Sequence, residues 1–149
     1  MMPAPTQVVC TRRIQFCAGH RVHRHESKCA NLHGHNYVAF FHATAPRLDS
    51  VGRVIDFSVL KDRLGSWIDT EWDHGFILYR DDAEAAAAVR LVAGQKLYFM
   101  DENPTAENMA LHLLEQVAPR VLAGTEARVV RVVLWETENC FADVRLADQ

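Results

Sequence analysis

The chain has 149 residues, of which 49% are hydrophobic and 23% are charged, and its formal net charge is -3. This length and composition predict a single globular domain over residues 1–149, and the weak negative charge argues against a nucleic-acid-binding protein. No apolar run approaches the roughly 20 residues of a membrane helix, and residues 1–7 lack the pattern of a secretion signal, so we expect a cytoplasmic protein.

The first third of the chain predicts two strands joined by a polar loop. Residues 8–18 are rich in β-branched side chains and partly alternate, which indicates a strand that runs up to His20. Residues 21–32 are polar and charged, as in a loop. Residues 35–44 have apolar side chains at both odd and even positions, which is typical of a strand covered on both faces.

The middle of the chain shows helical spacing. Asp56 is the expected N-cap of a helix whose apolar stripe is Leu60, Leu64, Trp67 and Ile68. A second, alanine-rich helix is expected from about residue 82 to 93, with Gly94 as its stop signal. A third helix should begin at residues 103–105 and end at Pro119.

The last third returns to strands, over residues 127–135 and 141–146. The order strand, strand, helices, strand, strand predicts an α+β fold with a four-stranded antiparallel sheet. Long apolar strands at the rims of such a sheet invite pairing with another copy of the chain. We therefore predict a homo-oligomer.

Histidine carries the clearest chemical signal, because six of the eight histidines fall between positions 20 and 42. On a strand, His33 and His35 project from the same face, and His20 ends the preceding strand. Three neutral imidazoles that converge suit a divalent transition metal, zinc above all, and leave one coordination position open, as in catalytic sites. The alternative is a pair of half-exposed strand histidines. The remaining clustered histidines are interpreted as loop or opposite-face residues, with His25 the first substitute ligand: His23, His25 and His42.

The four cysteines form no Cys-x-x-Cys pair, which is typical of reduced thiols in a cytosolic protein. Cys29 lies four residues before His33, where a metal ion and imidazoles would stabilise its thiolate. This thiol could act as a base or nucleophile, or could bind the metal itself. The others are interpreted as ordinary buried cysteines: Cys10, Cys17 and Cys140.

Three further motifs carry polar groups suited to a site. Asp73-His74 pairs a carboxylate with an imidazole, as in a catalytic dyad, although helix-end chemistry explains it equally well. Glu136 ends an apolar strand, where it could accept two N–H bonds from a guanidine-like edge or simply reach solvent. Thr105 lies in a helix-start motif, and a free helix N-terminus can also receive a ligand.

Taken in chain order, these motifs resemble the 6-pyruvoyltetrahydropterin synthase family, which includes the bacterial 6-carboxytetrahydropterin synthases. The resemblance extends from about residue 8 to residue 144, and Gly19 stands where the family usually has alanine. It rests on the segments Phe16–His20, Cys29–Tyr37, Val54–Lys61, Asp73-His74, Asn103–Asn108 and Glu136-Thr137.

The resemblance implies the tunnelling fold, in which each subunit contributes a four-stranded antiparallel sheet with helices on one side. Three subunits close a barrel, and two barrels commonly stack as a hexamer. It implies a Zn²⁺ ion held by His20, His33 and His35. It also implies that Cys29 is catalytic, together with Asp73 and His74 from a neighbouring subunit. Glu136 and Thr105 would contact the pterin ring.

The substrate implied by the resemblance is 7,8-dihydroneopterin triphosphate, handled by a zinc-dependent lyase. The carboxy branch of the family shortens the side chain and releases acetaldehyde and triphosphate on the path to queuosine, whereas the pyruvoyl branch keeps the side chain. The Cys-x-x-x-His-Gly-His spacing and the compact length favour the carboxy branch. A non-catalytic zinc-binding oligomer and a metallohydrolase are the alternatives. Candidate contacts to the triphosphate are Arg21, Arg24 and Lys28.

Overall fold

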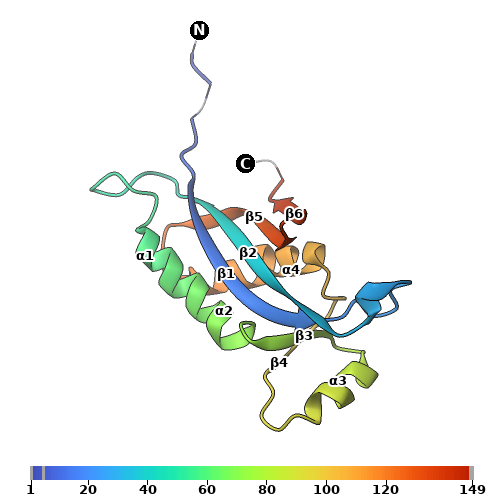
Figure 1. The fold of residues 1–149 in the computed structure, drawn as a ribbon. Coiled ribbons are helices and arrows are strands. Elements are labelled where there is room, and N and C mark those ends of the chain that lie inside the picture. Colours follow the sequence, from blue (N-terminus) through green and yellow to red (C-terminus); the bar gives the residue numbers. More distant parts are fainter. Residues whose placement is uncertain (1, 5, 148–149) are drawn as a thin grey trace.

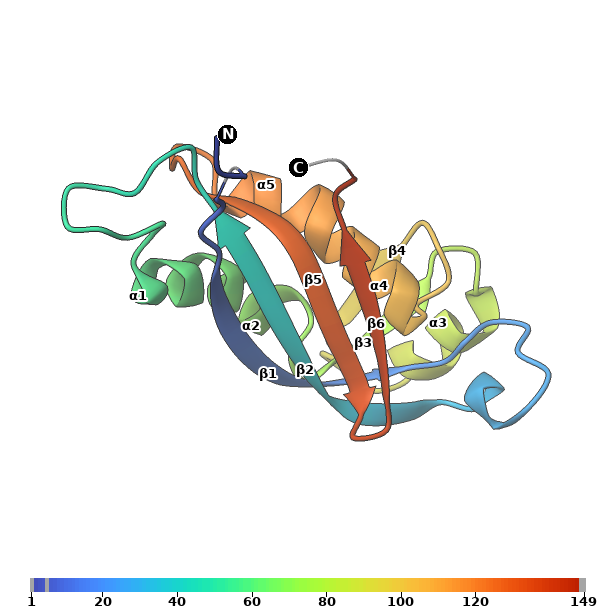
Figure 2. The same cartoon turned by 90° about the horizontal axis from the view of Figure 1, so that it is seen from above.

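The structure is a computed structural model that describes residues 2–4 and 6–147. A curved sheet forms one layer and two long helical segments form the other (Figures 1 and 2). Six strands make the sheet in the order β4-β3-β1-β2-β5-β6. They are β1 (Cys10–His20), β2 (His33–Thr44), β3 (Gly75–Tyr79), β4 (Leu97–Met100), β5 (Arg128–Thr137) and β6 (Cys140–Arg145).

The four predicted strands are confirmed, but the prediction of a four-stranded sheet is wrong. β1, β2, β5 and β6 form antiparallel pairs, whereas β3 runs parallel to the end of β1 over Ala18–His20 and β4 runs parallel to β3. The two additional strands have five and four residues. Both carry apolar residues on both faces, so neither shows the alternation by which a strand is found in a sequence.

The two long helical segments each contain a wider π-helical turn. The first consists of α1 (Phe57–Leu60), η2 (Lys61–Gly65) and α2 (Ser66–Glu71), and the Asp56 carboxylate caps it by accepting the Ser58 amide. Its predicted stripe is confirmed: Leu60, Leu64 and Ile68 are fully buried. Trp67, the fourth predicted member, is partly buried and packs against the same core. Within the described ranges, no helix combines the length and the apolar character that crossing a bilayer requires.

The second segment consists of α4 (Ala106–His112), η3 (Leu113–Val117) and α5 (Ala118–Val121). Thr105 caps it, because its hydroxyl accepts the Asn108 amide at 3.1 Å. The prediction that this helix ends at Pro119 is wrong. Pro119 falls in the first turn of α5, directly after the π-helical turn, where a residue without an N–H group is tolerated.

The short helix α3 (Ala83–Arg90) lies apart from these two segments. Asp82 caps α3 through the Ala85 amide, and the helix ends three residues earlier than residue 93, the predicted end. It packs on Leu78, while the neighbouring Ile77 belongs to the main core. Because adjacent strand residues face opposite sides, α3 covers the other face of β3. The expectation that all helices lie on one side is therefore wrong for α3.

The main core lies between the sheet and the two long segments (Figure 2). On β1, every second residue from Phe16 to His20 faces this core, and on β2 the core-facing residues include Tyr37, Ala39 and Phe41. His33 and His35 have the same parity as Tyr37. The apolar stripes of both strands therefore end in imidazoles on the helix-covered face of the sheet.

Candidate metal centre

Strand pairing brings the three predicted metal ligands together. In the β1–β2 ladder His20 is paired with His33, and Ala18 with His35. The ring centroids of His20 lie 4.6 Å from His33 and 5.1 Å from His35. A side-chain atom of each histidine and one of Glu136 all lie within 4.8 Å of one another. The predicted convergence of His20, His33 and His35 is thus present.

Backbone carbonyl groups orient two of these rings. His20 Nδ1 lies 2.7 Å from the carbonyl oxygen of Pro104, and His33 Nδ1 lies 2.6 Å from that of Asn31. A carbonyl oxygen only accepts, so each Nδ1 carries the hydrogen and each Nε2 keeps its lone pair. These two Nε2 atoms face each other at 3.1 Å. Two lone pairs at that distance are stabilised by a cation that both can bind.

His35 gives a second indication of a metal site. Its Nε2 atom is buried and has no hydrogen-bond partner. Burial lowers the pKa of His35, and the opposing effect of the Glu136 carboxylate does not restore it. The ring is therefore neutral near pH 7, which is the form that binds metals. An orphaned buried nitrogen beside two oriented Nε2 atoms fits a transition-metal ion such as zinc.

The Glu136 carboxylate belongs to the same group of side chains. Its Oε1 atom lies 3.0 Å from His35 Nε2 and 3.2 Å from His20 Nε2. Contact with the His20 ring lowers the pKa of Glu136, although the burial of Glu136 acts in the opposite direction. The sequence indicated a carboxylate at a strand end but not its place among the imidazoles. That place depends on the pairing of β2 with β5, in which Val38 lies opposite Trp135.

Several other predicted groups lie outside this cluster. Cys29 sits in the 3₁₀ turn η1 (Lys28–Ala30) and is partly buried, and its thiol is not among the converging ligand atoms. The expectation that Cys140 is buried is wrong, because it is exposed next to the β5–β6 turn. The three remaining clustered histidines are also outside the group, as predicted: His23, His25 and His42.

Asp73 and His74 form a hydrogen-bonded pair at the start of β3. Asp73 Oδ2 lies 2.8 Å from His74 Nδ1, and Asp73 Oδ1 accepts the Cys17 amide at 2.9 Å. Burial acts to raise the pKa of Asp73, but these hydrogen bonds hold it below its ordinary value. His74 also lines a shallow depression of about 280 Å³ together with Cys17, His33 and His35.

Arg21 is committed to a structural ion pair rather than free for a phosphate group. Its guanidinium donates to both oxygens of the buried Asp82 carboxylate, one of them at 2.6 Å from Nε, and also reaches Glu84 at 3.1 Å. The hydrogen bond from Arg21 lowers the pKa of Asp82. The loop after β1 is thereby fastened to the start of α3, and Arg21 becomes a poor candidate for triphosphate binding.

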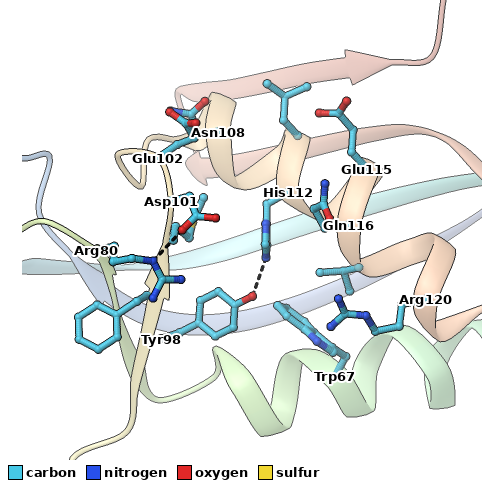
Figure 3. Close-up of a pocket in the computed structure, with 14 residues that line it drawn as sticks. Trp67, Arg80, Tyr98, Asp101, Glu102, Asn108, His112, Glu115, Gln116 and Arg120 are labelled. Carbon is cyan, nitrogen blue, oxygen red and sulfur yellow. Dashed lines mark hydrogen bonds and ion pairs between the residues drawn. The ribbon is translucent and has the colours of Figure 1, made fainter.

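A second cavity, of about 560 Å³, lies between α2, β4 and the α4–α5 segment (Figure 3). Trp67, Tyr98 and His112 line it, with Tyr98 Oη 2.6 Å from His112 Nε2. Burial raises the pKa of Tyr98 and lowers that of His112. This cavity shares no residue with the histidine and glutamate group. The candidate metal ligands therefore lie at the ends of β1 and β2, outside this cavity.

Comparison of sequences shows close relatives across almost the whole chain. The sequence model of the family described as 6-pyruvoyl tetrahydropterin synthase matches residues 9–147. A 6-carboxy-5,6,7,8-tetrahydropterin synthase of Rickettsia felis is 45% identical over 137 residues, which are 92% of this chain and 99% of the relative. The protein of the same name from Aquifex aeolicus is 31% identical, over 91% of this chain and 96% of its own length.

Comparison of structures agrees on the fold. An uncharacterized protein from Wolinella succinogenes superposes with a TM-score of 0.77 at 23% identity, covering 95% of this chain and 99% of its own. The 6-pyruvoyl tetrahydropterin synthase of Caenorhabditis elegans gives a TM-score of 0.67 at 23% identity, covering 98% of this chain and 100% of its own. At such identities the likeness concerns the fold alone.

Proposed function

This chain belongs to the 6-pyruvoyl tetrahydropterin synthase family, and on that premise we propose that it is a zinc-dependent 6-carboxy-5,6,7,8-tetrahydropterin synthase. The reaction would take 7,8-dihydroneopterin triphosphate and one water to the carboxylated pterin, acetaldehyde and triphosphate, a step toward queuosine. The observation that carries the proposal is the convergence of His20, His33 and His35 in a chain 45% identical to an enzyme of that name.

The three histidines would hold Zn²⁺ through their Nε2 atoms, with the Pro104 and Asn31 carbonyl groups fixing the rings. When bound, zinc supplies a Lewis acid that stabilises negative charge developing on the substrate side chain. The protein supplies rigidity, because His20 is fully buried and its ring is held by the Pro104 carbonyl. Such outer partners keep ligands oriented and raise their basicity.

Proton transfer would fall to Cys29 and to the Asp73–His74 pair. Asp73 holds His74 with its Nδ1–H donating, so the other ring nitrogen is available to take or give a proton. The His74 side chain is 78% exposed in the single chain. This exposure is consistent with a pair that serves the active site of a neighbouring subunit.

Glu136 and Thr105 would contact the pterin ring. A carboxylate can accept two N–H bonds at once from the guanidine-like edge of that ring. Thr105 follows Pro104, whose carbonyl holds His20, so its hydroxyl lies close in sequence to the metal-binding end of the sheet. This hydroxyl accepts the Asn108 amide, and its own hydrogen is available for a ligand.

We also propose that the subunits assemble as trimeric barrels stacked into a hexamer. β6 lies at one edge of the sheet, and β1 pairs with β3 only over Ala18–His20. The rest of β1 therefore presents backbone groups that an edge strand of another copy can pair with. Light scattering coupled to size-exclusion chromatography tests the assembly, and a monomer in solution contradicts it.

The decisive experiment is incubation of the purified protein with 7,8-dihydroneopterin triphosphate, followed by mass analysis of the pterin and an assay for acetaldehyde. A carboxylated pterin with acetaldehyde supports the proposal. A product that retains its full side chain indicates the pyruvoyl reaction instead. No turnover, combined with bound zinc, indicates a non-catalytic zinc-binding oligomer.

A further inference from the structure

We propose that Glu136 is a fourth metal ligand in the substrate-free protein and that it leaves the metal to bind the pterin ring. This inference deepens the proposed function and rests on it for the identity of the ring. The three histidines alone leave one coordination position open. Glu136 is the residue that fills this position, and its release would empty it when substrate arrives.

The distances among the four ligand atoms carry the first step. His20 Nε2 lies 3.1 Å from His33 Nε2, and Glu136 Oε1 lies 3.2 Å from His20 Nε2 and 3.0 Å from His35 Nε2. Bonds of about 2.0–2.1 Å to a tetrahedral zinc ion place neighbouring ligand atoms roughly 3.3 Å apart. These three separations are close to those between neighbouring ligand atoms of a tetrahedral zinc site, with the carboxylate oxygen as one of the ligands.

Hydrogen bonding alone accounts for this arrangement less well. His35 Nε2 lies 3.0 Å from the carboxylate oxygen and still has no hydrogen-bond partner. His20 and His33 already use their Nδ1–H groups on backbone carbonyls. Extra protons on the Nε2 atoms would create buried imidazolium charges beside each other, which is costly. A cation at the centre satisfies all four atoms.

The position of Glu136 allows it to change partners. Its side chain is 25% exposed, whereas that of His20 is 0% exposed. Glu136 lies near the end of β5, directly before Thr137, the last residue of the strand. A carboxylate bound through one oxygen can rotate toward a ring that offers two N–H groups. Ring binding would then precede, and permit, contact between the substrate side chain and the metal position.

The test uses the full-length protein with Co²⁺ in place of zinc, because the visible spectrum of Co²⁺ depends on the number and type of its ligands. The probe is pterin without a side chain, which has the guanidine-like edge but no side-chain hydroxyl. We expect pterin to change the wild-type Co²⁺ spectrum. We expect Glu136→Gln to differ from wild type before pterin is added and to show no such change afterwards.

Zinc affinity, measured by competition with a chelator, gives an independent readout. Glu136→Gln should weaken zinc binding by at least about tenfold, since loss of a mere outer partner of a metal ligand already costs 10–100-fold. Glu138→Gln is the matched control, because Glu138 is exposed in the turn two residues later and should behave as wild type. Glu136→Asp, which keeps the charge, serves the same comparison should the glutamine variant fail to fold.

Two results overturn the inference. Unchanged zinc affinity and an unchanged Co²⁺ spectrum in Glu136→Gln would mean that Glu136 is no ligand. Pterin that binds to the wild-type protein without altering the Co²⁺ spectrum would mean that Glu136 does not exchange. Neither readout uses turnover, so failure of the proposed reaction is seen separately, in the product assay with the triphosphate substrate.

Discussion

His74 donates a hydrogen bond from Nδ1 to the carboxylate of Asp73, the residue directly before it in the chain, at 2.8 Å. Sequence neighbours rarely bond in this way. Here His74 has a left-handed backbone, with φ at 61°, which turns its ring back toward Asp73. The second oxygen of Asp73 accepts the Cys17 amide. The pair is therefore fastened to β1, while the His74 ring remains open to solvent.

This geometry predicts that Asp73 acts by positioning His74. Asp73→Asn should lower kcat by about 10²–10⁴, with little change in KM and with zinc content unchanged. Partial recovery of kcat in Asp73→Glu would show that the loss comes from the missing carboxylate charge and not from a damaged fold. Asp69→Asn, an exposed acid on α2, is the control. Equal losses of kcat and of zinc in Asp73→Asn would assign Asp73 to the metal site instead.

The second prediction concerns Cys29, whose thiol lies outside the group of converging ligand atoms. Cys29→Ala should abolish turnover because a proton-transferring group is lost, while one zinc ion per chain remains bound. Metal analysis and the product assay on the same preparation check both parts. Cys140→Ala, at an exposed site, should keep full activity. Loss of zinc from Cys29→Ala would make the thiol a ligand after all.

The sequence predicted those parts of the fold and site that depend on local pattern. Strand parity was enough to place His33 and His35 on one face, and the spacing of Leu60, Leu64 and Ile68 was enough to find the first helix. Asp56 was recognised as a cap because its chemistry is contained within three residues.

The parts that were missed depend on contacts between distant segments. The Pro104 carbonyl reaches His20 across 84 positions, and Glu136 joins the imidazoles only through the register of β2 on β5. β3 is a short strand fixed by its parallel pairing with three residues of β1. None of these contacts leaves a periodic signal in the chain, so no pattern of residue types could have shown them.

Metal binding should stabilise the fold, because only the folded chain brings the three rings together. Removal of zinc with a chelator should lower Tm, and added zinc at about 100 times its Kd should contribute about 2.7 kcal/mol. His33→Ala should abolish this zinc-dependent rise in Tm. His42→Ala should retain it, since the His42 ring bonds to Thr11 and lies outside the group. A zinc response that survives in His33→Ala would contradict the ligand assignment.

The buried ion pair of Arg21 and Asp82 gives a prediction about pH. Because the folded-state pKa of Asp82 is lowered, its contribution is complete above the ordinary carboxyl pKa of about 4 and is lost as pH falls from there through the lower pKa of the folded state. Asp82→Asn should cost about 3 kcal/mol at neutral pH. Urea unfolding should show a difference from wild type that shrinks steadily as pH falls below that ordinary value.

Glu84→Gln is the matched control for this pair, since Arg21 also contacts Glu84 but that side chain is 85% exposed. Its effect should stay below about 1 kcal/mol throughout this pH range. A cost for Asp82→Asn that does not change with pH would show that the loss comes from packing or from the α3 cap, not from the carboxylate charge.

Gly19 makes close contact with Phe76, and this contact leaves no room for a larger side chain at position 19. The two residues are paired across β1 and β3. A Cβ atom added at Gly19 would lie 2.5 Å from Phe76 Cε1, closer than such atoms approach in proteins. Gly19→Ala should therefore destabilise the fold by about 1–3 kcal/mol, measured by urea unfolding. Gly65→Ala, where no atom comes nearer than 3.9 Å, should be neutral or slightly stabilising.

A double-mutant cycle identifies the cause. In a Phe76→Ala background the added methyl group meets no ring, so Gly19→Ala should lower the free energy of unfolding by less than about 0.5 kcal/mol. The coupling energy between the two substitutions should be about 1 kcal/mol or more. Additive costs would mean that the methyl group disturbs the β1–β2 ladder rather than Phe76. Zinc affinity gives the same distinction, because a disturbed ladder would also displace His20, the next residue on β1 and a proposed metal ligand.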